Sequence, residues 1–180
     1  MTLQVILLDV EGTTTPISFV YNKLFPYARN HIRAWLTDYY RDPVVQDAII
    51  CLERENATDI RHGAPQFSLS GNGRESPDAA AEYCLWLMDR DRKTTPLKTI
   101  QGLIWQDGFK RGELQSEVFA DVPVSFSEWH RKGHRVAIYS SGSVTAQRLV
   151  FEHTPYGSLL PLIDAFFDTR IGPKQYAKSY

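Results

Sequence analysis

The sequence predicts an α/β fold, a doubly wound parallel sheet interrupted by a large helical insertion. Short, continuous apolar runs, typical of strands covered on both faces, occur near the start of the chain and again in its last third. In that last third they alternate with helical patterns, which is the order that builds a parallel sheet. A long block between them has helical periodicity and no strand pattern. We therefore expect a core from residues 1–16 and 119–180, with residues 17–118 as the helical insertion.

The first strand and the helical block show different periodicities. Residues 3–10 read LQVILLDV, an apolar run that ends at Asp9 and is followed by the turn-forming segment EGTTTP. From Ile17 onward, apolar residues recur at helical spacing, and Pro26 is expected to start or break a helix. Residues 61–77 contain three glycines and two prolines, which predicts a loop. The other helices of the block are expected at residues 43–52, 79–88 and 95–105.

The last third of the chain alternates helices and strands. A helix is expected from Val124 to Lys132, because Gly133 suits the left-handed conformation that often ends a helix. The elements expected after it are a strand at 135–139 (RVAIY), a helix at 144–152 and a strand at 163–167 (IDAFF).

Size, charge and cysteine content narrow the class of protein. The 180 residues are 43% hydrophobic and 23% charged, which is a normal balance for a soluble globular protein. The net charge of -1 gives no field that would attract nucleic acid or an anionic membrane. No apolar run approaches the roughly 20 residues that span a bilayer, and the N-terminal run predicts a buried strand rather than a signal peptide. We expect a cytoplasmic protein in which Cys51 and Cys84 are reduced and mostly buried.

Polar residues follow each of the predicted strands. Asp9 and Glu11 come after the first strand, Ser140 and Ser141 after the second, and Lys174 shortly after the third. Because ligands of parallel sheets bind beyond the carboxyl ends of the strands, we expect these side chains to form one site.

This set of side chains suits phosphoryl transfer. The Asp9 carboxylate can attack phosphorus and form an aspartyl-phosphate, and Glu11 can protonate the leaving oxygen and then deprotonate water. Hydroxyl groups and a lysine can hold and neutralise the phosphate oxygens. A carboxylate that faces a phosphate dianion is repelled by it, so we expect a divalent cation, and Mg²⁺ is the usual oxygen-seeking choice.

The same residues carry a family resemblance. The pattern D-x-E-G-T at Asp9 resembles the first motif of the haloacid dehalogenase superfamily, and the serine-bearing strand end and the later lysine match its second and third motifs. Most phosphatases of that superfamily have Asp where this chain has Glu11. The stretches DVEGTTTPISFV, PLKTIQGLIWQDGF, YSSGS and FFDTRIGPK look like the enolase-phosphatases of methionine salvage, and the resemblance runs from Leu7 to Tyr180.

The resemblance implies a substrate and a role for each matched residue. The substrate would be 2,3-diketo-5-methylthiopentyl-1-phosphate, which is enolised and then dephosphorylated to an acireductone, with the helical block as a cap over the site. Asp9 would be nucleophile and metal ligand, and Glu11 would be general acid/base and contact the one Mg²⁺ of the chain. Ser140, Ser141 and Lys174 would bind the substrate phosphate. The enolising base stays open between Glu11 and a water on the metal.

The chain departs from the family in its last residues. The family continues with a strand that ends in an acidic cluster, whereas this sequence reads QYAKSY after Lys174. We therefore expect a truncated form with weak or no turnover, monomeric or self-associating through the exposed edge of its first strand. The alternatives are another sugar-phosphate phosphatase of the superfamily and a non-catalytic binding paralogue. His130 and His134 have metal-like spacing, but the helix is expected to end between them.

Overall fold

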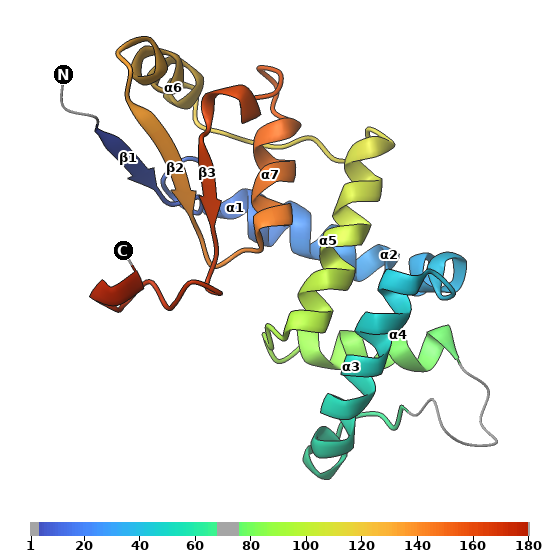
Figure 1. The fold of residues 1–180 in the computed structure, drawn as a ribbon. Helices are drawn as coiled ribbons and strands as arrows, with labels where there is room; N and C mark the ends of the chain where they lie inside the picture. Colours follow the sequence, from blue (N-terminus) through green and yellow to red (C-terminus); the bar gives the residue numbers. More distant parts are fainter. Residues whose placement is uncertain (1–3, 68–75, 180) are drawn as a thin grey trace. The chain divides into compact units, whose positions relative to one another are not determined.

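The chain separates into two compact units in a computed structural model that describes residues 4–67 and 76–179 (Figure 1). One unit, Met1–Phe25 with Trp105–Tyr180, contains the β-sheet and is called the sheet unit here. The other, Pro26–Ile104, has only helices and loops among its described residues and is called the helical unit.

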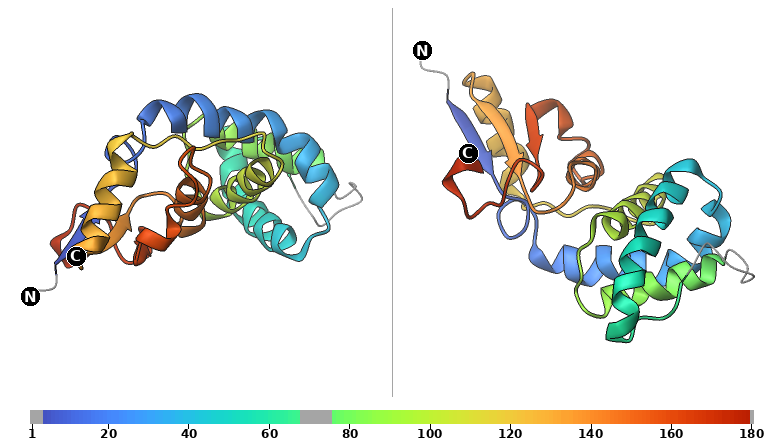
Figure 2. Two further views of the ribbon diagram at one scale, coloured as in Figure 1. Left: turned by 90° about the horizontal axis from the view of Figure 1, so that it is seen from above. Right: turned by 60° about the horizontal axis from the view of Figure 1, so that its bottom comes forward.

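The sheet unit is built on three parallel strands. β1 (Val5–Leu8), β2 (Arg135–Tyr139) and β3 (Ala165–Phe167) lie side by side in that order, with their arrows in the same direction (Figures 1 and 2). Leu8 pairs with Ile138, and Tyr139 pairs with Phe167. The prediction of an α/β fold with a parallel sheet is confirmed.

One face of this sheet is covered by α6 (Asp121–Arg131) and α7 (Val144–Glu152). The Phe151 ring on α7 lies 6.0 Å from the Phe126 ring on α6 and 6.2 Å from the Phe166 ring on β3. Because neighbouring side chains of a strand point to opposite faces, Tyr139 belongs to the other face of β2. The buried residues of the cluster are Val10, Val118, Val122, Phe126, Val136, Ile138, Phe151, Leu159 and Ile163.

The chain leaves the first loop of the sheet unit through a run of helical turns. α1 (Ile17–Phe19) leads into a π-helical stretch, Val20–Leu24, and then into α2 (Phe25–Tyr39). Pro26 cannot donate a backbone hydrogen bond, so the regular α-helical ladder is interrupted before it, and the Phe25 N–H bonds the Val20 carbonyl in a wider turn. This confirms the break expected at Pro26.

The helical unit consists of α2, α3 (Pro43–Asp59), a 3-10 turn (Ile60–His62), α4 (Pro77–Met88) and most of α5 (Thr95–Lys110). The helices start at clear sequence signals. Asp42 caps α3 by accepting a hydrogen bond from the Val44 N–H at 2.9 Å, and Ser76 caps α4 in the same way. Part of the loop expected at 61–77 lies outside the described residues.

Several predicted helix ends are wrong. α3 continues past residue 52 to Asp59, α5 continues past residue 105 to Lys110, and α6 begins at Asp121 rather than at Val124. β3 is also shorter than the predicted 163–167 strand. These ends lie where polar residues or Pro123 interrupt the apolar pattern.

Residues 17–25 and 105–118, which the sequence assigned to the insertion, group with the sheet unit. The reason is a local contact inside that unit. The Trp105 indole Nε1 donates a buried hydrogen bond of 2.8 Å to the Leu24 carbonyl, and the Phe25 and Trp105 rings lie 6.1 Å apart. The helical unit defined by its contacts is Pro26–Ile104, and the division into a core and a 17–118 cap stays a prediction.

Both cysteines are free thiols. Cys84 is fully buried on α4, and burial raises the pKa of its thiol to about 12. Cys51 is exposed on α3, so the prediction that both are mostly buried is wrong for this residue, which lies on the outer side of its helix. Among the described residues, no helix is both long and apolar enough to cross a membrane.

Candidate active site

The loop after β1 fixes the backbone around Asp9. The Val10 carbonyl accepts hydrogen bonds from the N–H groups of Thr14 and Thr15, at 3.0 and 2.9 Å, and the Thr14 hydroxyl donates to the Asp9 carbonyl at 3.1 Å. Gly12 has a φ of 76°, which a glycine adopts readily and which allows the loop to turn this tightly. The Asp9 carboxylate is oriented by its own loop, because Oδ1 accepts a hydrogen bond of 2.8 Å from the Val10 N–H.

The second carboxylate oxygen of Asp9 forms an ion pair with the Lys174 ammonium group. Both side chains are about one-third exposed, so the pair is accessible to solvent. The Tyr139 ring lies beside this pair, with its centre 5.9 Å from the Lys174 ammonium group. The structure thus brings together two of the predicted site residues that are far apart in the sequence.

The serines leave β2 at the same edge of the sheet. The Ser140 N–H donates to the Phe167 carbonyl at 3.2 Å, and the buried Ser140 Oγ accepts a hydrogen bond of 3.0 Å from the Gly142 N–H. Ser141 is exposed. Since Leu8 and Ile138 are paired, Asp9 lies level with Tyr139 on the neighbouring parallel strand, and the two serines follow directly after that position.

Glu11, like Ser141, is an exposed residue of the predicted site. It lies two residues after Asp9 on the loop and is exposed, and its backbone forms a parallel bridge with Thr15. Its side chain can therefore reach a ligand from the solvent side of the loop.

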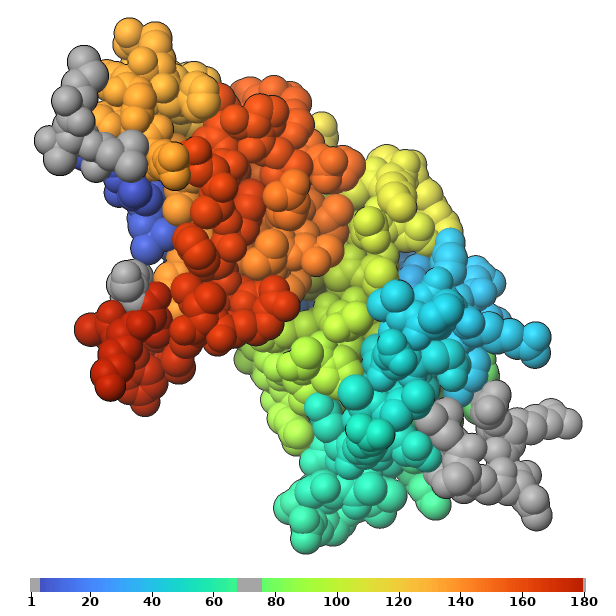
Figure 3. All heavy atoms as spheres, in the orientation of Figure 1, coloured from blue at the N-terminus to red at the C-terminus, as the bar shows by residue number. Residues whose placement is uncertain are grey.

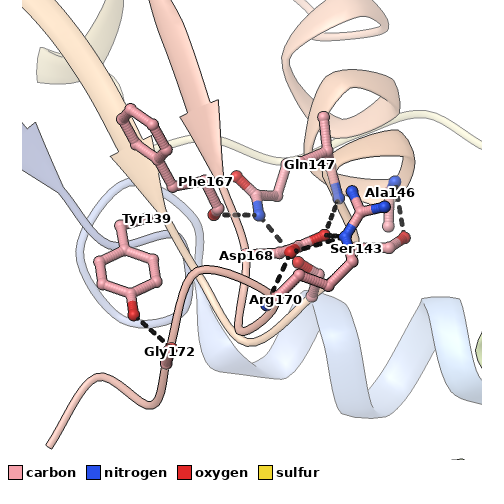
Figure 4. Close-up of polar contacts among 10 residues, drawn as sticks. Tyr139, Ser143, Ala146, Gln147, Phe167, Asp168, Arg170 and Gly172 are labelled. Atoms are coloured by element: carbon pink, nitrogen blue, oxygen red, sulfur yellow. Dashed lines mark hydrogen bonds and ion pairs between the residues drawn. The ribbon is translucent and has the colours of Figure 1, made fainter. Parts of the chain in front are cut away.

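Asp168, at the end of β3, is a buried carboxylate that the sequence analysis missed (Figure 4). Its Oδ1 accepts hydrogen bonds from the Arg170 backbone N–H and guanidinium Nε, each at 3.0 Å, and its Oδ2 accepts one from the Val144 N–H at 3.3 Å. Burial by itself raises the pKa of this carboxyl, but the hydrogen bonds from Arg170 and Val144 outweigh it and lower the pKa below its ordinary value. The signal that could have found Asp168 is its place at the carboxyl end of a predicted strand.

Gln147 joins the serine loop to β3. Its side-chain amide nitrogen donates hydrogen bonds of 2.8 Å to the carbonyls of Gly142 and Phe167, and the residue is buried (Figure 4). Ser143 caps the first turn of α7, with its Oγ accepting from the Ala146 N–H at 3.2 Å. The loop that carries Ser140 and Ser141 is therefore held at both ends.

Comparison with known proteins identifies the family. No protein-family model matches the sequence. The chain is 43% identical to an enolase-phosphatase E1 of Synechococcus elongatus over 180 residues, which cover all of this chain and 74% of that protein. It is 42% identical to enolase-phosphatase E1 of Drosophila melanogaster, over 98% of this chain and 68% of that protein. The chain belongs to the enolase-phosphatase E1 family.

A solved structure shares the fold of nearly the whole chain. The UTR4 protein of Saccharomyces cerevisiae matches 98% of this chain with a TM-score of 0.70 and 30% sequence identity, over 72% of its own chain. The haloacid dehalogenase-like fold that the sequence resemblance implied is therefore supported by both sequence and structure.

The oxygen donors at the end of β1 fit the Mg²⁺ ion that the enolase-phosphatase family implies. Asp9 and Glu11 are hard oxygen ligands two residues apart. Residues 4–67 and 76–179 contain no group of three or more His, Cys, Asp or Glu side chains that could hold a metal ion. His130 and His134 therefore form no such group with other described residues.

Proposed function

We propose that this chain is a Mg²⁺-dependent enolase-phosphatase. Its proposed substrate is 2,3-diketo-5-methylthiopentyl-1-phosphate, and its product is the acireductone 1,2-dihydroxy-3-keto-5-methylthiopentene of methionine salvage. Family membership supports the reaction class. The observation that carries the proposal for this chain is the ion pair of Asp9 and Lys174 at the carboxyl edge of the sheet, a nucleophile beside a phosphate-binding cation.

In the proposed phosphoryl transfer, an Asp9 carboxylate oxygen attacks phosphorus, and the bond between phosphorus and the leaving oxygen breaks. Glu11 donates a proton to that leaving oxygen. Water then attacks the aspartyl-phosphate while Glu11 takes its proton, which releases inorganic phosphate and restores the Asp9 carboxylate. Lys174 offsets negative charge on both the nucleophile and the phosphate throughout.

The two serines bind the phosphate oxygens in this proposal. The exposed Ser141 offers a hydroxyl to the ligand, and Ser140, whose Oγ already accepts the Gly142 N–H, retains its hydroxyl hydrogen to donate. Asp9 and Glu11 would hold the Mg²⁺, which when bound reduces the repulsion between the carboxylate and the phosphate dianion.

Enolisation precedes phosphate release and requires removal of a carbon-bound proton from the diketone. Glu11 is the first candidate for this base, and a water molecule is its rival. All the proposed site residues come from one chain, so we propose that the monomer is the active form. We also propose that the chain is cytoplasmic.

The test is an assay of the purified chain with Mg²⁺ that follows phosphate release and acireductone absorbance together. The proposal predicts that the absorbance rises before or with phosphate, that a chelator abolishes both, and that Asp9→Asn lowers turnover by about four orders of magnitude or more. Asp121→Asn, an exposed aspartate in the same unit, is the matched control and should retain turnover.

Other results would overturn the proposal in distinct ways. Phosphate released only from a panel of sugar phosphates, without acireductone, would indicate a different phosphatase. No release from any substrate, with Asp9→Asn indistinguishable from the wild type, would indicate a non-catalytic protein that acts by binding.

A further inference from the structure

Lys174 is held by the segment that precedes it. This segment, Thr169–Lys174, follows β3 and lies on the surface of the sheet unit, where Figure 3 shows it in red. Lysine has four rotatable side-chain bonds, so its ammonium group is well placed only if its backbone is fixed.

Two buried or nearly buried hydroxyl groups hold the two carbonyls before Lys174. The Tyr139 hydroxyl donates a hydrogen bond of 2.6 Å to the Gly172 carbonyl (Figure 4), and the Ser179 hydroxyl donates one of 2.8 Å to the Pro173 carbonyl. Between these carbonyls the proline ring fixes φ. The peptide groups on both sides of Pro173 are thus oriented, and Lys174 follows directly.

The conformation at Gly172 depends on this glycine. Its φ is 141°, a region that residues with a Cβ avoid, and an added Cβ would collide with the Ser179 side chain. The orientation of the carbonyl that accepts the Tyr139 hydrogen bond therefore depends on a backbone conformation that glycine adopts with little strain.

Tyr139 is itself rigidly placed. It is the last residue of β2, pairs with Phe167 on β3, and is only 2% exposed. Its ring also faces the Lys174 ammonium group at 5.9 Å, within reach of a cation–π attraction. The same side chain thus orients the Lys174 backbone and contacts its charge.

We propose that Tyr139 is a positioning residue that holds Lys174 against Asp9 through the Gly172 carbonyl. The residue does not touch the reacting atoms. The inference deepens the proposed function, and its effect on turnover rests on that function, but the position of Lys174 can be measured without any substrate.

The primary experiment measures the rate at which an amine-reactive acetylating reagent modifies Lys174, quantified by peptide mass spectrometry with Lys110 as the internal reference. Tyr139→Phe removes the hydroxyl and keeps the ring. Because one hydrogen bond is lost, Lys174 should be labelled about fivefold faster than in the wild type. Asp9→Asn, which removes the partner of the ammonium group, verifies that the assay reports release of Lys174.

Tyr83→Phe is the matched control for this substitution. Tyr83 is also fully buried, and its hydroxyl donates a bond of 2.7 Å, but to Asp59 in the helical unit. It should leave Lys174 labelling unchanged even where it lowers Tm. Ser179→Ala, which frees the next carbonyl, should increase labelling too and gives a second measurement if Tyr139→Phe folds poorly.

Activity gives an additional readout. Tyr139→Phe should lower kcat/KM for phosphate release about fivefold, and Tyr83→Phe should not. Unchanged labelling of Lys174 in a folded Tyr139→Phe would overturn the proposal, and if that variant does not fold, unchanged labelling in Ser179→Ala would do so. Absence of turnover in the wild type would instead overturn the proposed function, because the labelling comparison stands without it.

Discussion

The two units each contain a buried aspartate, and the two aspartates are used differently. Asp59 in the helical unit and Asp168 in the sheet unit are 5% and 6% exposed, and each contacts an arginine. In both, burial raises the pKa of the carboxyl and hydrogen bonds outweigh it, so both pKa values lie below the ordinary value. Chemically the two groups are close counterparts.

Their partners differ. Asp59, at the end of α3, accepts hydrogen bonds from the Tyr83 hydroxyl at 2.7 Å and from Arg92 at 3.3 Å, so it joins three segments of the helical unit. Asp168 accepts hydrogen bonds from Arg170 and from the first turn of α7, and so it orders the loops at the carboxyl edge of the sheet. The position of a buried carboxylate in the fold thus decides whether it joins helices, as Asp59 does, or orders the loops of the candidate site, as Asp168 does.

Asp9 differs from Asp59 and Asp168 in the exposure of its side chain. The side chains of Asp9 and Lys174 are each about one-third exposed. A ligand can therefore reach both groups and replace the contact between them. Exposed ion pairs contribute little to stability. We therefore expect substitutions of this pair to change activity more than stability, and substitutions at Asp59 to do the reverse.

After the nucleophile itself, the largest effect is expected for Lys174→Ala. On the proposed function, phosphate release should fall about 100- to 1,000-fold, because the phosphate loses a fixed positive charge, while Tm changes little. Steady-state phosphate release and thermal unfolding measure the two quantities.

Lys23→Ala is the matched control, since Lys23 also pairs with an acid, Glu117, in the sheet unit. It should leave turnover within about twofold. Equal losses of activity in the two variants would contradict the proposed role of Lys174 in phosphate binding.

Asp59→Ala should give the largest loss of stability. It removes the partner of the buried Tyr83 hydroxyl and of Arg92, so the free energy of unfolding should fall by about 2–3 kcal/mol. Urea unfolding followed by tryptophan fluorescence measures the loss, and hydrogen exchange should place it in α3 and α4.

Glu128→Ala provides the reference for an exposed ion pair. Glu128 contacts Lys132 at 3.7 Å on α6, with both side chains about half exposed. Its removal should change the free energy of unfolding by less than about 0.5 kcal/mol. A loss as large as that of Asp59→Ala would show that burial is not what distinguishes these carboxylates.

The fold was predictable where the local sequence signals agree. The predicted bounds of β2 and α7 match the structure, because Gly133 ends the preceding helix and Ser143 caps the next. The end of α3 was missed for a physical reason. Its last buried positions are the polar Asn56 and Asp59, whose burial depends on partners from other segments, so the apolar periodicity stops too early.

In the site too, local sequence signals were readable, whereas contacts between distant segments were not. Asp9, Ser140, Ser141 and Lys174 could be placed at one edge from the order of the strands alone, and the structure brings Asp9 and Lys174 into contact. Tyr139 could not be found in this way. As the last residue of an apolar strand it looks like core, and its hydrogen bond exists only because the chain turns back at Gly172. The catalytic and binding roles of the predicted residues stay predictions.

The smallest effect concerns Glu55, which lies one turn before Asp59 on α3. Burial raises the pKa of the Glu55 carboxyl, and the positive charge of Arg92 offsets this only in part. Within residues 4–67 and 76–179, its buried Oε2 has no hydrogen-bond partner. In the helical unit, folding therefore favours the ionised form of Asp59 and disfavours that of Glu55. In the sheet unit, folding favours the ionised form of Asp168.

The sign of the pH dependence follows. Because the folded-state pKa of Glu55 lies above its ordinary value of 4.5, its contribution is most favourable below about pH 4.5 and is lost as the pH rises through the folded-state pKa. The Asp59 contribution is present above its ordinary pKa and is lost as the pH falls through the depressed one. Glu55→Gln should therefore stabilise the chain by about 0.5 kcal/mol at pH 7 and have no effect near pH 4.

Urea unfolding at a series of pH values measures this difference, with the exposed Asp47→Asn on the same helix as the control. A gain at pH 7 that persists unchanged at pH 4 would mean that Glu55 acts through its shape rather than its charge. The contrast between Glu55 and Asp59, whose pKa values are shifted in opposite directions, would then not explain the effect of the substitution.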